Sequence, residues 1–257
     1  MINKIDVTAP GKKTPKGAMH PLTKEIREME RIFHSIGFEI NDGPWVENEF
    51  YNFDAMNVPK NHPARDMQDT FWIKNLKEVV LRTHTSGVQA RYMANKKPPI
   101  RIIVPGRVFR NESTDARHEA EFHQLEGLLV GKNISIANLR SVIGEFFKKY
   151  LGEELEIRTR PGYFPFVEPA FEIDVTCFGC FGKDKKCELC NGTGWVEVVP
   201  GGMVHPNVLE SVGIDSEKYQ GFAFGLGVER TIMQKYGIKD VRVFLDSKTP
   251  FTKQFNK

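Results

Sequence analysis

Long apolar runs are missing from this sequence, and so are cysteines outside one short stretch. No apolar segment is long enough to span a bilayer, and residues 1–11 lack the apolar core of a signal peptide. We therefore expect a cytoplasmic protein. A strong charge of one sign is also missing, since the formal net charge is only +3. This value neither requires nor excludes a nucleic-acid partner, because a local patch of charge matters more than the total.

Internal repeats, low-complexity tracts and nucleotide-binding fingerprints are absent as well. The glycines of residues 221–227 do not have the dinucleotide-binding spacing, and Gly182-Lys183 is not part of a phosphate-loop pattern. The 257 residues are 40% hydrophobic and 27% charged, a balance typical of a globular enzyme. We expect a basic, irregular lead-in over residues 1–19, followed by one large domain over residues 20–257.

Hydrophobic spacing predicts a helix near the start of this domain. Ile26, Met29, Phe33 and Ile36 recur at intervals of three and four, and Gly37 is placed to end the helix. Residues 38–47 are predicted to be extended, and the proline among them favours an edge or interface strand. Residues 50–70 are predicted to form a long loop.

Strands dominate the rest of the predicted secondary structure. They are expected near 70–74, 79–85, 100–104, 107–112, 121–130, 155–159, 170–176, 195–199 and 220–225. Helices are expected near 87–95, 135–150 and 228–236. Strands joined by short turns with few helices between them favour an antiparallel sheet flanked by helices, an α+β (α/β) fold class.

The segments 105–112 and 121–127 place several chemically versatile side chains close together. On strands, residues two apart share a face, so Arg110 and Glu112 should point the same way, as should Phe122, Gln124 and Glu126. An arginine suits a phosphate, an aromatic ring can stack on a base, and a carboxylate can hold an ammonium group. The alternative is a solvated hairpin with alternating polar residues.

Three further stretches are candidates for a ligand site. In residues 82–86, His84 and Ser86 should share a strand face, and for His84 we favour hydrogen bonding over general base catalysis. Residues 221–230 predict a strand and a helix carrying Arg230, with small residues that could floor a pocket. Residues 163–169 contain an aromatic run that could form the wall of an aromatic ligand site. Ordinary core packing is the alternative for the last two stretches.

The cysteines follow the pattern Cys177-x2-Cys180-x6-Cys187-x2-Cys190. Paired Cys-x2-Cys knuckles indicate zinc, and four thiolates would fill a tetrahedral ion and leave no open position. Extended segments on both sides place the knuckles at the tip of a β-hairpin. We therefore predict a structural zinc site, with four free thiols as the alternative.

Taken together, these stretches closely resemble the α subunit of heterodimeric, bacterial-type phenylalanyl-tRNA synthetases, a class II family. The resemblance rests on residues 20–23, 52–55, 62–66, 82–86, 104–110, 122–127, 163–166, 202–206 and 221–225. It implies the class II catalytic fold over residues 20–257, with a zinc-knuckle insert at 177–190. The three class II motifs would be 22–47, 104–127 and 221–236. The family's α chain normally begins with a coiled-coil arm, and this sequence starts after the point where the arm would end.

The resemblance also implies an activity and a set of site residues. The chain would activate L-phenylalanine with ATP and magnesium, then transfer it to the 3′ end of tRNA(Phe). The phosphate arginines would be Arg110 and Arg230, and the other ATP contacts would be Glu112, His118 and Phe122. The amino acid would be surrounded by His84, Ser86, Gln89, Gln124, Glu126, Phe164, Phe166, Ala223 and Gly225. Glu168 would bind magnesium together with a β chain.

Two alternatives to this function stay open at this point. One is a non-catalytic, synthetase-like binding or regulatory protein, and the other is a class II ligase for a different acid. The presence of Arg110 and Arg230 argues against the first, and the aromatic run with Ala223 argues against the second. The resemblance implies an α2β2 assembly with a β chain, or a homodimer through residues 22–47. Gln68 occupies a position where some relatives carry a tryptophan over the substrate.

Overall fold

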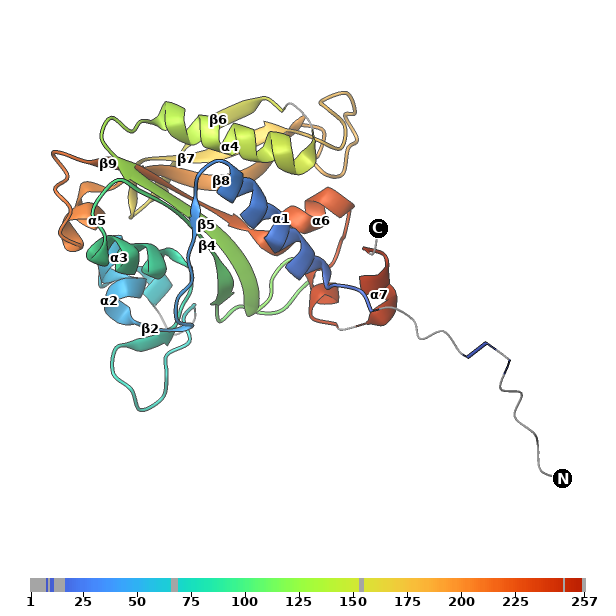
Figure 1. Ribbon diagram of the computed structural model, residues 1–257, viewed down its shortest axis with the longest axis horizontal. Coiled ribbons are helices and arrows are strands. Elements are labelled where there is room, and N and C mark those ends of the chain that lie inside the picture. Colours follow the sequence, from blue (N-terminus) through green and yellow to red (C-terminus); the bar gives the residue numbers. More distant parts are fainter. Residues whose placement is uncertain are drawn as a thin grey trace.

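The computed structural model describes residues 8, 10–11, 17–65, 69–152, 155–246 and 248–255 (Figure 1). The helices are α1 (Pro21–Ser35), α2 (Glu49–Asn52), α3 (Ser86–Asn95), α4 (Ile136–Leu151), α5 (Pro206–Ser211), α6 (Val228–Tyr236) and α7 (Thr249–Lys253), with 3-10 turns at η1 (Asp54–Met56), η2 (Pro63–Arg65) and η3 (Val241–Phe244). The strands are β1 (Glu39–Ile40), β2 (Val46–Asn48), β3 (Val79–Leu81), β4 (Ile100–Phe109), β5 (Glu121–Gly131), β6 (Ile157–Phe164), β7 (Val167–Thr176), β8 (Trp195–Val204) and β9 (Gln220–Gly227).

A seven-stranded sheet organises the described part of the chain. Its order is β1-β4-β5-β9-β8-β7-β6, and every pair is antiparallel except the two-residue pairing of β1 with β4. β2 and β3 form a separate antiparallel pair. The predicted α+β class with a mostly antiparallel sheet is therefore confirmed.

Helices cover the two faces of the sheet with two apolar clusters. α1, α4 and α6 gather over one face, where Phe33, Phe146 and Ile232 join one buried cluster (Figure 1). α2, α3 and α5 lie on the other side, where Ala90 and Leu209 join the second cluster. The site described below lies on this second side, beside α3.

The first predicted helix is confirmed with small changes at its ends. α1 begins at Pro21, and the His20 ring accepts a hydrogen bond from the Leu22 N–H at 3.3 Å. Proline suits the first helical turn because the N–H that it lacks has no partner there anyway. Gly37 follows the helix with φ at +88°, a conformation that glycine adopts without strain. The helices predicted near 87–95, 135–150 and 228–236 are confirmed as α3, α4 and α6.

Several predictions of extended or irregular structure were wrong in whole or in part. The prediction of an extended segment at 38–47 is confirmed only in part, because two short strands, β1 and β2, lie on either side of Pro44, and β1 lies at the edge of the sheet. Residues 50–70 contain α2 and two 3-10 turns instead of one long loop, because the Asn48 side chain accepts a hydrogen bond from the Phe50 N–H and starts a helix. Near 70–74 the structure has only a single bridge, between Trp72 and Val80.

The strands predicted at 100–104 and 107–112 are one strand, β4, which passes through Pro105 and ends at Phe109. Pro105 has no N–H to donate, and it is tolerated because β1 pairs only with Ile102 and Ile103 and does not extend to it. Most of the basic lead-in at 1–19, together with Asp66 and Gln68, lies outside the described residues. Within the described part of the chain, no helix is long and apolar enough to cross a membrane.

Candidate active site

A buried carboxylate, that of Glu126 on β5, faces the first turn of α3. Its Oε1 accepts a hydrogen bond from the Thr85 N–H at 3.1 Å. Its Oε2 accepts from Ser86 Oγ at 2.5 Å and from Gln89 Nε2 at 3.2 Å. Ser86 and Gln89 reach the same carboxylate because residues three apart share a helix face. The Glu126 side chain is held in one orientation and is only 6% exposed.

The charge of Glu126 is not matched by a cation at contact distance. Burial raises the pKa of the Glu126 carboxyl, while its hydrogen bonds with Ser86 and Thr85 and the Arg110 charge act in the opposite direction. Glu126 has no ion pair within the described ranges. A buried carboxylate held only by neutral donors is costly, so a cation supplied by a ligand would be strongly favoured there.

Arg110 lies beside this carboxylate, just beyond the end of β4. Its guanidinium lies 5.0 Å from the centre of the Phe122 ring, and its Nε donates to the Thr83 carbonyl at 3.2 Å. Burial lowers the pKa of Arg110, whereas nearby carboxylates favour its charged form, and an arginine stays cationic in proteins. The predicted strand alternation of Arg110 with Glu112 was wrong, because both residues follow the strand.

His84 lies in the bend that precedes α3, and Ser86 is the first residue of that helix. The prediction that the two share a strand face was therefore wrong. Burial, followed by the charge of Arg110, lowers the pKa of His84 to about 4. His84 Nδ1 and Gln124 Oε1 are both buried and lack hydrogen-bond partners in the described structure. Unpaired buried polar atoms are rare in folded proteins, and each of these two is available to a polar ligand.

An apolar wall adjoins the polar groups. Phe164 and Phe166 stack with ring centres 5.9 Å apart at the turn between β6 and β7. Phe166 and Ala223 are partly buried against the same apolar cluster. On β9, Gly225 pairs with Glu126, and a Cβ at this glycine would lie 3.1 Å from Glu126 Cγ. Gly225 therefore lies directly beside the buried carboxylate, and Ala223 lies two residues along the same strand, opposite Leu128.

The remaining predicted residues lie around this centre without touching the carboxylate. Arg230 is exposed on α6 and lines a groove of about 320 Å³. Glu168 is exposed on β7, and Glu112 is half-buried. His118 is exposed and pairs with Asp115, with 3.0 Å between Nδ1 and Oδ2. None of these four predicted residues forms a hydrogen bond or ion pair with Glu126 within the described ranges.

The four cysteines meet at the tip of the hairpin between β7 and β8, as predicted. All four Sγ atoms lie within 4.8 Å of one another. The Cys177–Cys187 and Cys180–Cys190 sulfur pairs are 3.8 and 3.7 Å apart. A tetrahedral zinc with Zn–S bonds of about 2.3 Å requires sulfurs roughly 3.8 Å apart. The donor set therefore fits a four-thiolate metal site.

Comparison of the sequence with known proteins identifies a family. Residues 4–255 match the class II core domain of tRNA synthetases. The chain is 51% identical over 255 residues to proteins named phenylalanine–tRNA ligase alpha subunit from Anoxybacillus flavithermus, Bacillus cytotoxicus and Bacillus cereus. These alignments cover 98% of this chain and 73% of each relative. The chain belongs to the phenylalanine–tRNA ligase alpha-subunit family. The fold, family and ligase class expected from the sequence are thereby confirmed.

The sequence analysis missed residues that hold the site of this family member in place. Asn52 is fully buried, and its side chain forms two 3.1 Å hydrogen bonds with Thr83, one to the Thr83 N–H and one to its hydroxyl. The Thr83 carbonyl in turn accepts a hydrogen bond from Arg110 Nε. Two residues later, the Thr85 N–H donates to Glu126. Asn52 lay in a stretch that carried the resemblance, but neither spacing nor residue type indicated that it contacts a residue 31 positions later.

Proposed function

We propose that this chain activates L-phenylalanine with ATP and transfers it to tRNA(Phe), as the catalytic α chain of a phenylalanine–tRNA ligase. The single observation that carries the proposal is the buried Glu126 carboxylate, which has neutral donors on one side and pocket-lining small residues on the other. The α-ammonium group of the amino acid would supply the missing cation, and its aromatic side chain would pack against the adjoining apolar wall. Residues 20–257 would form the catalytic domain, with residues 177–190 as its insert.

Each end of the amino acid has matching groups in this arrangement. Glu126 would bind the ammonium group, while His84, Ser86, Gln89 and Gln124 would orient the polar end by hydrogen bonding. The unpaired buried atoms of His84 and Gln124 would gain partners from the ligand. The phenylalanine ring would pack among Phe164, Phe166, Ala223 and Gly225. Edge and stacked contacts between aromatic rings favour such a ligand over an aliphatic one.

ATP would bind beside the amino acid, along the end of β5. Phe122 would stack on adenine, Arg110 and Arg230 would hold the phosphates, and Glu112 and His118 would make further contacts. Arginine suits this role because its fork donates two parallel hydrogen bonds to phosphate oxygens. When bound, magnesium would neutralise phosphate charge, and the exposed Glu168 would contribute to holding it together with a partner chain.

The proposed chemistry has two steps and needs no protein nucleophile. The amino-acid carboxylate attacks the α-phosphorus of ATP, which gives the aminoacyl-adenylate and releases pyrophosphate. The tRNA 2′-hydroxyl then attacks the acyl carbonyl and AMP leaves. Arg110 and Arg230 would lower the barrier of the first step by placing positive charge where negative charge develops. With its pKa near 4, His84 would be uncharged at neutral pH, which supports a hydrogen-bonding role.

Pyrophosphate exchange into ATP, measured with a panel of amino acids, tests the proposal. We expect exchange with phenylalanine and much less with leucine or tyrosine. Exchange with a different acid would favour another class II ligase. No exchange with any amino acid, with or without a partner chain, would favour the non-catalytic synthetase-like alternative.

The cysteine site would hold a structural zinc in this proposal. The 3.7 and 3.8 Å sulfur spacings support it, and all four thiols are free in the structure. Free clustered thiols also support a cytoplasmic location, where cysteines are kept reduced. Elemental analysis should find about one zinc per chain, because one set of four thiolates fills one tetrahedral ion. A folded, metal-free protein would contradict this assignment.

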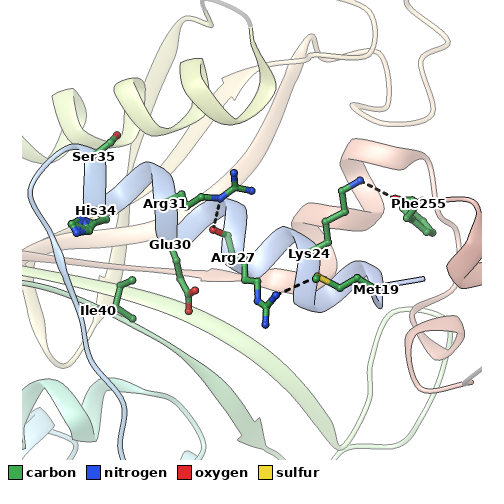
Figure 2. Close-up of a pocket in the computed structure, with 9 residues that line it drawn as sticks. All are labelled: Met19, Lys24, Arg27, Glu30, Arg31, His34, Ser35, Ile40 and Phe255. Atoms are coloured by element: carbon green, nitrogen blue, oxygen red, sulfur yellow. Dashed lines mark hydrogen bonds between the residues drawn. The ribbon is translucent and has the colours of Figure 1, made fainter. Parts of the chain in front are cut away.

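The outer face of α1 would be the contact with a partner subunit. A groove of about 740 Å³ runs along this helix, and Figure 2 shows Lys24, Arg27 and Arg31 along it, with Met19 at one end. Trp45 and Val46 are 51% and 50% exposed nearby in sequence, which favours association. The groove is separate from the Glu126 site. Sedimentation at several concentrations, alone and with a β chain, should show an α2β2 complex or a homodimer; a monomer with full activity would contradict this.

A further inference from the structure

The cysteine hairpin forms one side of the groove that contains Arg230. This groove, of about 320 Å³, lies where the hairpin approaches α6, and Figure 1 shows both elements at the same end of the sheet. The hairpin contributes Cys190, Asn191 and Thr193, whereas α6 contributes Arg230 and Gln234. Residues far apart in the sequence therefore enclose the proposed phosphate arginine from two sides.

The position of the hairpin beside α6 is fixed by packing. Phe178, between two of the cysteines, is partly buried against both the main apolar cluster and the cluster around Cys177 and Cys190. At the tip, Lys239 and Glu188 form a 2.9 Å ion pair, although both are exposed and the pair adds little energy. The apolar contact of Phe178 is therefore the stronger reason for the hairpin to stay next to Arg230.

Charged groups of both signs line the groove, and its two carboxylates, Asp174 and Glu197, are both paired with arginines, Glu197 with Arg160 at 2.9 Å. Asp174, only 2% exposed, holds Arg158 and Arg160 through contacts of 2.6 to 2.9 Å. The Arg158 guanidinium also lies 4.5 Å from the centre of the Trp195 ring. Among the described residues, Arg230 has no ion-pair partner.

The hairpin side of the groove adds an exposed amide. Asn191 is exposed, and its backbone has φ at +51°, which asparagine tolerates better than most residues. Its side chain has no hydrogen-bond partner among the described residues. Thr193 is less available, because its hydroxyl already donates to the Cys190 carbonyl at 2.6 Å.

We propose that the four-cysteine hairpin is a wall of the phosphate site, and that this groove receives the outgoing pyrophosphate. The inference rests on the proposed function, in which Arg230 holds the ATP phosphates. It adds the hairpin as the opposite wall of that phosphate site. Pyrophosphate carries several negative charges and many acceptor oxygens, which match Arg230, the Asn191 amide and the Gln234 amide. The metal site would then hold a substrate-binding wall in place as well as stabilising a loop.

Titration with inorganic pyrophosphate and magnesium, followed by the fluorescence of Trp195, tests the proposal on the full chain with its partner. Trp195→Phe identifies the part of the signal that comes from the groove. Asn191→Asp keeps the side-chain size and the left-handed backbone preference but adds a negative charge. We expect pyrophosphate to bind Asn191→Asp roughly fivefold or more weakly, the scale of one repulsive charge a few ångströms away at a surface.

Asn133→Asp is the matched control. Asn133 is exposed, has φ at +59° in the turn after β5, and lines neither groove. It should bind pyrophosphate like the parent. Gln234→Glu adds the same charge from the helix side and should weaken binding to a similar extent. Zinc content should stay at the parent value in all variants, which separates a charge effect from loss of the hairpin.

Parent-like pyrophosphate binding by Asn191→Asp, in a protein that exchanges pyrophosphate with phenylalanine, would overturn the inference alone. Weakening by Gln234→Glu without any effect of Asn191→Asp would also overturn it, because the hairpin would then not be a wall. Absence of exchange with every amino acid would instead overturn the proposed function. In that case the titration still decides whether the groove binds pyrophosphate and whether the hairpin contributes.

Discussion

Two buried glutamates, one in each face of the molecule, show opposite electrostatic behaviour. Glu25 on α1 is 2% exposed and Glu126 on β5 is 6% exposed. Glu25 accepts hydrogen bonds from Lys235 Nζ at 2.8 Å, Tyr150 Oη at 2.6 Å and Tyr236 Oη at 2.7 Å. Burial acts to raise the pKa of Glu25, but these partners outweigh it and the pKa is lowered. The pKa of Glu126 is raised.

The difference lies in where the neutralising cation comes from. Glu25 has Lys235 within the chain, so its charge is balanced and it ties α1 to α4 and α6. Glu126 has only neutral donors at contact distance, so its charge is destabilising until a ligand supplies a cation. Perturbed carboxyls of this second kind concentrate at functional sites. We therefore infer that Glu25 stabilises the fold, and we propose that Glu126 serves ligand binding.

The strongest test of this contrast is Glu126→Gln. The substitution keeps the side-chain size but removes the charge expected to bind the substrate ammonium. A lost charge-assisted contact costs roughly 2–4 kcal/mol, so exchange with phenylalanine should fall by roughly thirtyfold to a thousandfold in kcat/KM. The free energy of unfolding should change little or rise, since an unpaired buried charge is removed. Near-normal exchange would show that Glu126 does not bind the substrate. Glu145→Gln, on the exposed face of α4, is the control.

The reverse outcome is expected for Glu25→Gln. Lys235 would lose its carboxylate, and breaking a buried ion pair costs about 3–5 kcal/mol. The Lys235 side chain is 23% exposed, so water can partly solvate it after its carboxylate partner is removed. We therefore expect a smaller loss, of about 2–3 kcal/mol, in the free energy of unfolding. Urea denaturation measures this change. Below the unfolding transition, the KM for phenylalanine should match the parent, and a large rise in KM would show that the two glutamates are not functionally separate.

The sequence predicted one of these glutamates and missed the other for physical reasons. Glu126 was found because β5 is regular, so its alternation with Gln124 and Phe122 could be counted along the chain. Glu25 is one turn before Met29 on an amphipathic helix, where a charged residue normally marks the solvent side. Its partners lie 125 to 211 residues away, and no local pattern indicates them.

Local pattern also failed where the chain leaves regular structure inside the site. His84 lies in a bend and Arg110 lies in the irregular segment after β4, so counting strand faces gave them the wrong neighbours. The roles predicted for these two residues come from the family resemblance and stay predictions. The contacts that hold them, such as Asn52 with Thr83, depend on how the separate β2–β3 unit packs against β4, which a sequence does not specify residue by residue.

Lowering the pH should separate the two glutamates in the wild-type chain. A lowered carboxyl pKa contributes stability above the unfolded value, and Glu25 loses it only as the pH falls through its lowered pKa. Glu126, with its raised pKa, becomes neutral earlier during acidification. His84, with a pKa of about 4, stays neutral above pH roughly 5. As the pH is lowered from neutral, phenylalanine binding should weaken before the unfolding midpoint falls, as measured by equilibrium dialysis and thermal melts. A parallel decline of both would contradict the contrast.

The smallest expected effect concerns the pocket beside Glu126. Ala223→Gly removes one methyl from β9 at the apolar wall, next to the strand that carries the carboxylate, and should let exchange proceed with para-chlorophenylalanine. The gain should be several-fold, because one methyl group in a pocket is worth roughly 1 kcal/mol or slightly more. Glycine in a strand also costs about 0.5–1 kcal/mol in stability, so a control must carry the same penalty away from the site. Ala137→Gly on the exposed part of α4 does so, in the helix that carries the Glu25 partner Tyr150. It should lower stability by a similar amount and leave substrate choice unchanged. If both variants accepted the larger substrate equally, the selectivity would follow from stability, and Ala223 would not line the pocket.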